Sequence, residues 1–387
     1  MKTILILGAG TGGTVVSHAL RRKAGGDVKI VLIDREKKHL FAPSLLWLMT
    51  GDRKADTISR EINLFRKKGV EVVTGEIEKV DPGKKSVVVN GKNYSGDYLV
   101  ISIGAELVKP SELKANGFNF YCLKGAELFR DVLMKFNGGK ICILISSLPY
   151  KCPAAPYEAA MLIEYFLRKN GLRNKSEISI YSPEPFPLPV TGKENGEAVM
   201  KILLAKGIKY FPQHQWTRAG EHTIEFANGA RAEFDLMGYV PVHKCPKVIQ
   251  ESGLTGKSGW VDVDKHTMEV LPAPSPSGEG WGGVYAIGDI TGIPLPNGKF
   301  LPKAGVFAHY QAEVVAHNIA QKISGKGGVK KFNGEGQCFL ETGDGKAGYA
   351  TGNFYAAPDP VVLMKKPGTW SHWKKVWFEK YWFWKYF

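Results

Sequence analysis

The N-terminus carries a pattern that few folds accommodate. An apolar run at residues 3–7 leads into a glycine-rich loop, a helical segment, and a second apolar run, VKIVLID, ending at Asp34. The loop glycines are Gly8, Gly10, Gly12 and Gly13. In a dinucleotide-binding βαβ unit, the first glycine permits a tight turn, the second admits a pyrophosphate, and the last allows close helix–strand packing. The helix N-terminus attracts the phosphates, and Asp34 would bind the adenosine ribose hydroxyls.

Two later segments favour FAD over NAD at this site. DYLVISIGA is an acid, a buried strand and a glycine turn ending at Ala105, and GVYAIGD is a strand ending in Gly288 and Asp289. Both resemble segments of flavoproteins with two dinucleotide-binding domains, in which the second aspartate bonds the ribityl and phosphate region of the flavin. Asp289 could instead cap a helix.

We therefore expect an α/β fold with two Rossmann-like domains. The FAD-binding domain would comprise residues 1–110 and 270–315, and the second domain would be inserted between them at 111–269. Residues 316–387 would form a C-terminal region with an amphipathic, membrane-binding tail at 368–387.

The inserted domain begins like a nucleotide-binding unit but lacks its phosphate loop. A strand at residues 140–147 leads into LPYKCPAAPYE, which contains no glycine, and then into a helix. Proline removes an amide donor, and side chains keep the backbone away from a pyrophosphate. We expect no functional NAD site here, so electrons would not arrive from NADH.

A cysteine takes the place of the missing glycines. Cys152 precedes a helix start, where free amides and the helix dipole favour a thiolate, and Lys151 adds positive charge. This arrangement predicts a low-pKa thiolate that acts beside a flavin as nucleophile or redox partner. The alternative is a buried structural cysteine.

Charge and composition restrict the remaining possibilities. The net charge of +15 fits an anionic membrane and an anionic cofactor, and no nucleic-acid-binding motif accompanies it. The five cysteines lack metal-site spacing, so no metal is expected. No uncharged apolar run is long enough to span a bilayer. The N-terminal apolar stretch runs directly into the glycine loop, so we interpret it as a strand and not as a cleaved signal peptide.

The C-terminal tail is rich in tryptophan and lysine. At helical spacing, five aromatic residues share one face: Trp370, Trp373, Trp377, Tyr381 and Trp384. Such rings prefer the headgroup level of a bilayer, and lysines meet anionic lipid. The tail predicts a helix lying on a membrane, which would make the protein a peripheral membrane protein. The alternative is an aromatic helix packed on the protein itself or on a second subunit.

Four segments together resemble sulfide:quinone oxidoreductases and the flavin subunit of flavocytochrome c sulfide dehydrogenases. They are CPAAPYE at 152–158, HLFAPSL at 39–45, PKAGVFA at 302–308 and GQCFLETG at 336–343. The resemblance covers nearly the whole chain, including the membrane-attachment region. It implies a peripheral membrane flavoprotein that contains FAD, oxidises sulfide to polysulfide and reduces membrane quinone. Members of the family commonly self-associate, so a homo-oligomer is expected.

The resemblance also assigns roles to residues. Cys152 and Cys338 would form the redox pair, and Cys122 resembles a third cysteine. Glu158 is a candidate acid or base, or a plain first-turn helix glutamate. Lys303, with Ala304 and Gly305 at a helix start, would face the flavin pyrimidine and stabilise the reduced form, or Lys303 would simply face solvent. Aromatic candidates for the quinone site, any of which could be core packing, are Phe41, Phe339, Phe354 and Tyr355.

Three other functions remain open. A flavocytochrome flavin subunit would pass electrons to a haem partner, usually after export. A type II NADH dehydrogenase shares the fold and the tail but predicts a glycine-rich turn at 148–153. A redox-sensing flavoprotein without enzymatic activity would not need Cys338 in its motif.

Overall fold

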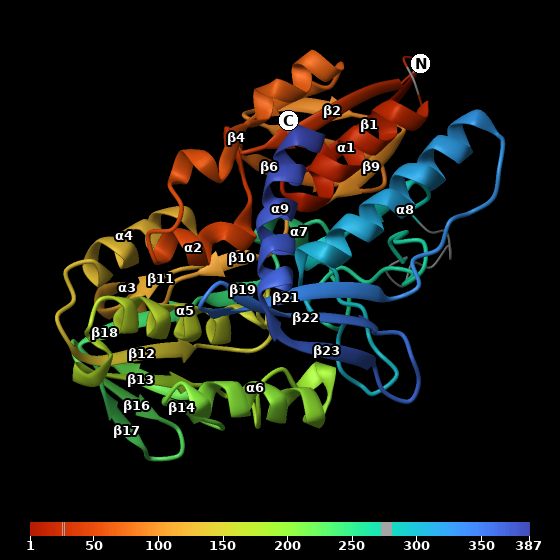
Figure 1. The fold of residues 1–387 in the computed structure, drawn as a ribbon. Helices are drawn as coiled ribbons and strands as arrows, with labels where there is room; N and C mark the ends of the chain where they lie inside the picture. The colour runs from red at the N-terminus through yellow and green to blue at the C-terminus, as the bar shows by residue number, and fades with distance from the viewer. Residues whose placement is uncertain (25, 27, 272–280) are drawn as a thin grey trace.

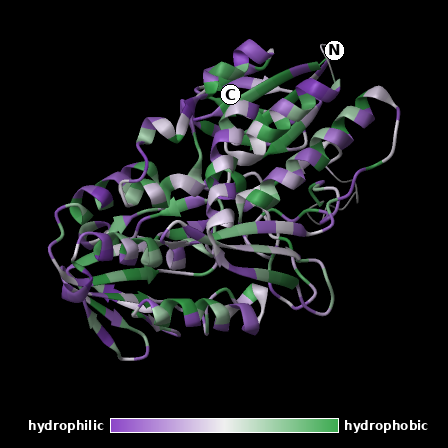
Figure 2. Ribbon diagram, in the orientation of Figure 1, coloured by the Kyte–Doolittle hydropathy of each residue, from purple (hydrophilic) through white to green (hydrophobic). Residues whose placement is uncertain are grey.

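The computed structural model describes all residues except 25, 27 and 272–280. Two parallel α/β units lie one above the other, and a C-terminal hairpin sheet and helix run along the side of both (Figure 1). The strands of both units contain the green, apolar segments of the molecule (Figure 2). Part of the expected second segment of the FAD domain, 270–315, lies outside the described residues.

The first unit is a five-stranded parallel sheet. Its strands, in spatial order, are β20 (Val284–Ala286), β9 (Tyr98–Ile101), β1 (Lys2–Leu7), β2 (Val28–Asp34) and β5 (Glu71–Thr74). Helices α1 (Thr11–Ala24) and α8 (Gly305–Ser324) pack on one another beside it. The chain leaves this sheet after β9 and rejoins it as β20, at the neighbouring position.

The second unit is also a five-stranded parallel sheet. Its strands, in spatial order, are β11 (Phe118–Asn119), β18 (Leu236–Val240), β12 (Gly139–Ile145), β13 (Ser176–Tyr181) and β14 (Ile208–Phe211). Its helices are α3 (Ser111–Asn116), α4 (Leu123–Leu133), α5 (Ala155–Lys169) and α6 (Lys193–Ala205). The β12–turn–α5–β13 path repeats that of β1, α1 and β2.

Smaller elements fill the connections. They are β3 (Lys38–Leu40), α2 (Leu45–Met49), β4 (Ser59–Glu61), β6 (Ile77–Asp81), β7 (Ser86–Val89), β8 (Lys92–Ser95), β10 (Glu106–Val108), β15 (Trp216–Ala219), β16 (Thr223–Phe226), β17 (Arg231–Glu233), β19 (Val242–Lys244) and α7 (Lys247–Gln250). The antiparallel pair β10 and β19 carries the chain between the two units.

The packing associates the segment before residue 270 with the first unit. Buried side chains from Cys245 to Val270 pack in the same core as β1 and β2, not in that of β12 and β13. The pattern missed this because the segment contains isolated bridges and no long strand. We propose that the first domain resumes near residue 245 instead of 270.

The C-terminal region lies across both units. Antiparallel strands β21 (Glu335–Gly343), β22 (Lys346–Asn353) and β23 (Val361–Gly368) lead into helix α9 (Thr369–Tyr386), which runs up the molecule from the second unit to the first (Figure 1). None of the described helices combines the length and apolar character that crossing a membrane requires.

The inner face of α9 is fixed to the protein by polar anchors. Glu379, with a fully buried side chain, accepts hydrogen bonds from Ser44 Oγ at 2.5 Å and from Arg53 Nε at 3.0 Å. One turn further on, Trp382 Nε1 donates to His39 Nε2 at 3.0 Å. The His39 Nδ1–H must therefore donate to Ala9 O, 2.8 Å away in the glycine loop. The alternative of a helix packed on the protein's own core is thus correct for this face.

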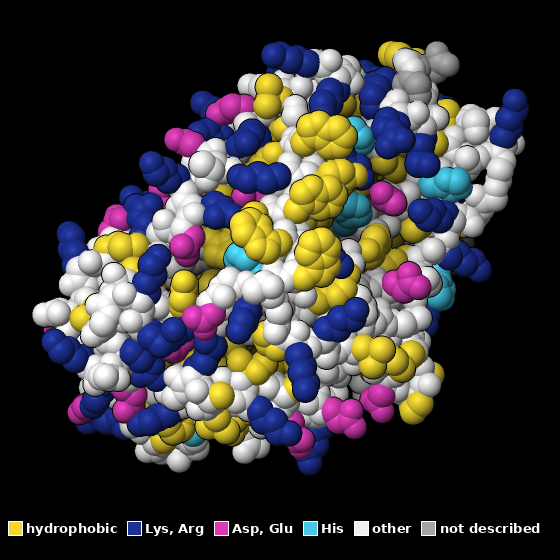
Figure 3. Space-filling view, viewed as in Figure 1, with side chains coloured by type: hydrophobic (Ala, Val, Ile, Leu, Met, Phe, Trp, Pro, Cys, Tyr) yellow, Lys and Arg dark blue, Asp and Glu magenta, His cyan; other side chains and the backbone are white. Residues whose placement is uncertain are grey.

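The outer face of α9 is exposed. Four tryptophans of this helix are exposed, and Figure 3 shows a column of hydrophobic side chains on the surface among many Lys and Arg side chains. The exposed fractions of the tryptophans are 72% for Trp370, 62% for Trp373, 64% for Trp377 and 78% for Trp384. The face predicted from helical spacing is the face turned to solvent. Not every lysine of the tail lies on this exposed face, because Lys375 is buried.

The buried His39 makes stability dependent on pH. Burial lowers the pKa of His39 to about 4, so the folded protein keeps the ring neutral while the unfolded chain takes up a proton below its ordinary pKa of 6.5. Stability should therefore fall as the pH drops from 6.5 towards 4. We expect a loss of roughly 2 kcal/mol from this ring at about pH 5, measured by urea unfolding. His39→Gln should remove this part of the pH dependence and His317→Gln should keep it; equal curves for the two variants would contradict the assignment.

Candidate functional site

The glycine loop between β1 and α1 has the shape that a dinucleotide needs. Gly8 has φ +93°, and a Cβ there would lie 2.4 Å from Ser102 O. A Cβ on Gly13 would lie 1.8 Å from Gly8 O, so helix and strand touch at this point. A Cβ on Gly10 would have no heavy atom within 4 Å, so this part of the backbone faces open space.

Asp34 braces the loop from the end of β2. Its Oδ2 accepts the Ala9 N–H at 2.5 Å, and its Oδ1 accepts the Glu36 N–H at 2.7 Å. Burial raises the pKa of the Asp34 carboxyl, while these two N–H donors lower it. A carboxylate has about four acceptor positions, so two remain for ribose hydroxyls.

Two helix N-termini converge on the open side of the loop. Ala304 precedes α8, and a Cβ on Gly305 would lie 3.4 Å from Thr11 Oγ1, at the start of α1. Both positive dipole ends thus face one place. Beside them, the buried Oδ1 of Asp289 has no hydrogen-bond partner among the described residues. The unpartnered carboxylate oxygen of Asp289 can accept hydrogen bonds from ribityl hydroxyls, and the two helix starts can bind a pyrophosphate. These residues therefore fit FAD.

Lys303 lies in the loop before α8. Its Nζ donates to the carbonyl oxygens of Asp289 at 2.7 Å and Thr291 at 3.1 Å, and lies 3.3 Å from the centroid of the Trp260 ring. Burial lowers the pKa of Lys303 to about 8. The side chain is therefore buried, which excludes the alternative of a solvent-facing lysine.

The turn between β12 and α5 meets this loop directly. The N–H of Cys152 donates to Lys303 O at 2.7 Å, and the Tyr121 hydroxyl donates to Cys152 O at 3.3 Å. Cys152 has φ +49°, a left-handed conformation that is unfavourable for a side chain with a Cβ. The bond to Lys303 thus places this cysteine against the first unit, and the Tyr121 hydroxyl fixes the same residue within the second unit.

The expected low pKa of Cys152 is wrong. Burial, and then the neighbouring Cys338 and Glu158, raise the pKa of its thiol well above the ordinary value, and Lys375 lowers it only in part. Desolvation outweighs the helix dipole. The dipole stabilises a thiolate by about 1 kcal/mol, whereas full burial can raise the pKa of an acidic group by about 3–5 units. Cys338 is accessible to solvent, but protein atoms surround it on other sides, and this desolvation raises the pKa of its thiol to about 12.

The structure brings Cys152, Cys338 and Glu158 together. Charge on Cys338 raises the pKa of Cys152, and charge on Glu158 raises the pKa of both thiols. Glu158 is buried, and its Oε1 accepts the Glu341 N–H and the Lys375 Nζ, each at 2.8 Å. Strand β21 carries Cys338 and Glu341, and it packs against α5, which carries Glu158. Glu158 is thus a partner in a buried network and not a plain helix glutamate.

Sequence reasoning missed three residues of this network. Lys375 comes from α9 and is buried, with its Nζ 4.9 Å from the centroid of the Trp47 ring. His372 Nδ1 lies 2.9 Å from Glu341 Oε2, while the other oxygen of Glu341 is buried without a partner among the described residues. Burial raises the pKa of the Glu341 carboxyl. The sequence indicator for Lys375 was a charged residue at an inward-facing position of the helix. It was overlooked because the tail is rich in lysine.

The nucleotide pocket of the second unit is filled. Glu184 lies three residues after the end of β13, whereas Asp34 is the last residue of β2. Its Oε2 accepts the hydroxyl protons of Tyr150 at 3.0 Å and Tyr157 at 2.8 Å, and both tyrosines belong to the turn and helix that replace a phosphate loop. The acid that would hold a ribose is therefore sealed inside the protein.

The remaining candidates lie in separate places. The Cys122 thiol donates to Asn119 O at 3.5 Å, and the described contacts do not join it to the other two cysteines. Phe41 packs on α9, 5.8 Å from Phe383, and Phe339 packs on Tyr349 at 5.1 Å. Phe354 packs on Phe307 at 5.0 Å, and the Tyr355 hydroxyl donates to Lys265 O. These four aromatic residues do not share one ring cluster.

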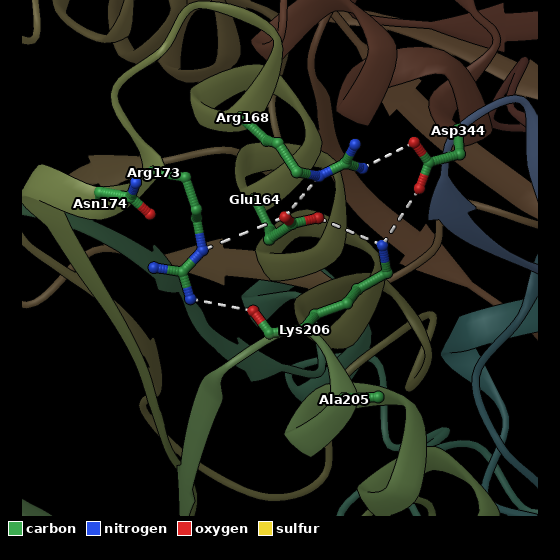
Figure 4. A pocket seen from close by; sticks show the side chains of 7 residues that line it. All are labelled: Glu164, Arg168, Arg173, Asn174, Ala205, Lys206 and Asp344. Carbon is green, nitrogen blue, oxygen red and sulfur yellow. Dashed lines mark hydrogen bonds and ion pairs between the residues drawn. The ribbon is translucent and has the colours of Figure 1, made fainter.

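A cavity of about 550 Å³ lies at the ends of α5 and α6, beside the connections that lead into β13 and β14 (Figure 4). Its charged groups are paired: the buried Glu164 lies 2.9 Å from Arg168, 3.1 Å from Lys206 and 4.0 Å from Arg173, and Arg168 and Lys206 also reach Asp344. A network of this kind holds α5, α6 and the β21–β22 hairpin together, which gives these charges a structural role.

Lys375 and Glu158 carry opposite charges near the thiols, so replacing each of them should shift the pKa of the thiols in opposite directions. Lys375→Met should raise the pKa of both thiols and slow their alkylation by iodoacetamide at a given pH, because the variant removes a neighbouring positive charge. Glu158→Gln should move the alkylation profile to lower pH. Each change leaves one buried charge unpaired, so roughly 3–5 kcal/mol of stability should also be lost. A shift of both profiles in the same direction would contradict the geometry.

The glycine loop provides a second test. Gly13→Ala should destabilise the protein by roughly 1–3 kcal/mol or more, because its Cβ would collide with Gly8 O. Gly10→Ala meets no protein atom, so it should retain the melting temperature of the apoprotein and weaken flavin retention. Thermal unfolding and bound-flavin absorbance separate the two effects; equal unfolding losses in both variants would argue against the role of Gly13.

Comparisons with known proteins agree with this geometry. Residues 2–145 match the model of the pyridine nucleotide-disulphide oxidoreductases, and residues 126–187 match that of the central part of the sulfide dehydrogenase [flavocytochrome c] flavoprotein chain. The sulfide-quinone reductase of Aquifex aeolicus is 27% identical, with 99% of this chain and 91% of that protein covered. Mouse mitochondrial sulfide:quinone oxidoreductase is 22% identical over 92% of this chain and 79% of its own length.

Solved structures show the same fold. The sulfide:quinone oxidoreductase of Aquifex aeolicus superposes with a TM-score of 0.89, at 24% identity, over 100% of this chain and 91% of that chain. NDH2 from Plasmodium falciparum in complex with NADH superposes with a TM-score of 0.72, at 15% identity, over 100% of this chain and 96% of that chain. The chain is therefore a homologue of the sulfide:quinone oxidoreductases and has the α/β flavoprotein fold.

Proposed function

We propose that this protein is a sulfide:quinone oxidoreductase that converts sulfide to polysulfide and passes the electrons to quinone. The observation that carries this assignment is the proximity of the free thiols of Cys152 and Cys338, with Cys152 at the turn where a nucleotide's phosphates would bind. Homology to enzymes of this activity over nearly the full chain supports the same reaction.

The cofactor is FAD, held by the glycine loop, Asp34, Asp289 and the converging starts of α1 and α8. When bound, FAD accepts two electrons from the thiol site and delivers them to quinone. Lys303, whose pKa is lowered to about 8, can hold or release a proton at Nζ near neutral pH beside Asp289.

The thiol chemistry follows from the environment of the pair. Hydrosulfide attacks an oxidised Cys152–Cys338 linkage, a persulfide forms on one cysteine, and the other leaves as a thiolate. Such a thiolate is costly in this buried site, and Lys375 is the cation that offsets its charge. Glu158 holds the Lys375 ammonium in place through its Oε1.

Type II NADH:quinone oxidoreductases are also relatives, and one from Staphylococcus aureus is 23% identical over 84% of this chain. NADH would need the second unit as its binding domain. Proline and tyrosine occupy the turn there, and Glu184 is bonded to Tyr150 and Tyr157. These contacts favour sulfide over NADH as the electron donor.

The outer face of α9 is the proposed membrane contact. Four of its tryptophans are exposed, and rings of this kind favour the headgroup level. Quinone is dissolved in lipid, so a quinone site near this helix has the shortest route to its substrate. Of the four aromatic candidates, Phe41 packs directly on α9, and we propose it as the first quinone contact to test.

Replacing either redox cysteine tests the proposed function. Cys152→Ser and Cys338→Ser should each abolish sulfide-dependent reduction of a short-chain quinone, with losses of at least about a thousandfold, because the exchange requires both sulfurs. Bound flavin should remain near one per chain. Cys142→Ser, in the core of β12, is the matched control and should retain activity in the folded fraction. Full activity in either redox variant would refute the two-thiol mechanism.

The membrane contact needs a selective variant. Removing residues 368–387 would also remove Lys375 and Trp382, so loss of activity or of folding would not identify an anchor. Replacing Trp370, Trp373, Trp377 and Trp384 by Gln should instead move the protein from membranes to the soluble fraction and leave activity with a soluble quinone unchanged. Unchanged sedimentation with membranes would argue against α9 as the contact.

A further inference from the structure

A second cavity of about 190 Å³ lies where the end of α9 meets α1 and α8. Four cations line it: Arg22, Lys23, Lys330 and Lys385. Among the described residues, Glu313 is the one acid in its wall, so the lining has an excess of three positive charges. Glu313 is itself engaged by Lys330 at 3.8 Å and by His309 at 3.6 Å.

A buried hydroxyl also lines this cavity. Tyr386 is 1% exposed and lines the cavity; the Lys385 ammonium acts on its hydroxyl oxygen as a donor, but the described residues offer its O–H no acceptor. Leaving such a donor without an acceptor costs about 1–3 kcal/mol. An anionic oxygen in the cavity would accept this O–H and meet the surrounding cations. The cavity therefore combines a free donor with uncompensated positive charge.

The pKa values of two neighbouring groups reflect the positive charge around the cavity. Burial, and then Lys68, Arg22 and Lys385, lower the pKa of His18 to about 4, so this ring is neutral and adds no charge near pH 7. His309, Lys330 and Lys385 lower the pKa of Glu313 to about 2. Positive charge from three separate elements thus acts on this one place.

The flavin cannot account for these cations. The dinucleotide phosphates belong at the start of α1, at Thr11, and Arg22 lies eleven residues further along the same helix. At 1.5 Å per residue, this separation is about 16 Å. Basic residues do stabilise the C-terminal end of α1, but Lys330 and Lys385 come from other segments and do not serve that purpose.

The chemistry of the ligand can be inferred from the position of the cavity. Lys385 follows Trp384, whose indole is exposed on the outer face of α9, and the surrounding surface is rich in Lys and Arg (Figure 3). If the indoles lie at headgroup level, then the cavity opens at the depth of lipid phosphates. We propose that this basic pocket, lined by Arg22, Lys23, Lys330, Lys385 and Tyr386, binds the phosphate diester of an anionic membrane lipid. The proposal rests on the membrane contact proposed above for α9.

Vesicle flotation of the holoenzyme tests the proposal. The vesicles contain phosphatidylcholine alone, phosphatidylcholine with phosphatidylglycerol, or phosphatidylcholine with oleate at equal surface charge. The wild type should prefer phosphatidylglycerol over oleate, because a carboxylate cannot reproduce the diester's contacts. Tyr386→Phe should lose that preference. Arg22→Gln/Lys385→Gln should weaken binding to phosphatidylglycerol by about fivefold per charge, which corresponds to about 1 kcal/mol each.

Lys169→Gln/Lys201→Gln is the control, with the same change in net charge on α5 and α6. It should bind like the wild type. Equal binding to phosphatidylglycerol and oleate by the wild type, or pocket variants that match the control, would overturn the proposal while leaving the membrane contact intact. Loss of the preference on adding inorganic phosphate would also overturn it, because the pocket would then take the free ion. Absence of binding to every vesicle would instead refute the contact of α9, and activity with a soluble quinone reports the enzyme separately.

Discussion

The turn between β12 and α5 joins the two halves of the site, and one backbone hydrogen bond fixes it. Cys152 N–H donates to Lys303 O at 2.7 Å, and the Lys303 side chain is in turn held by the carbonyls of Asp289 and Thr291. The thiol of the second unit is therefore placed beside the dinucleotide cradle of the first by contacts that do not involve its sulfur. A glycine loop at this turn would admit phosphates, but here Tyr150 fills the space and is bonded to Glu184.

Helix α9 gives the site its remaining charge and connects it to the surface. Lys375, Glu379 and Trp382 lie on one face and reach Glu158, Arg53 and His39. The opposite face carries the exposed indoles. Because one rigid helix carries both faces, the groups that would rest on lipid and the cation that offsets a thiolate move together. This arrangement would connect the proposed membrane contact to the thiol site through one helix.

Local patterns predicted what depends on neighbours in sequence. The glycine loop, Asp34, the missing second phosphate loop and the outward face of α9 follow from spacing over a few residues, and the structure has each of them. The pairing of Cys152 with Cys338 came from a resemblance to a family, since no local rule joins them.

What the sequence did not reveal depends on docking. Lys375 and Glu158 are 217 positions apart, and they meet only because α9 packs on β21 and β22 while β21 packs on α5. The pKa of Cys152 was predicted in the wrong direction because a helix dipole can be read from sequence and the depth of burial cannot. The proposed boundary near residue 245 was missed for a similar reason, since the segment joins the first core through isolated bridges.

The central claim is that sulfur has replaced a pyridine nucleotide as the source of electrons. Anaerobic titration of the holoenzyme, followed by flavin absorbance, tests this claim directly. Sulfide should bleach the flavin within the time of mixing, and an added short-chain quinone should restore the colour, whereas NADH should leave the spectrum unchanged. Rapid bleaching by NADH together with no response to sulfide would contradict the account.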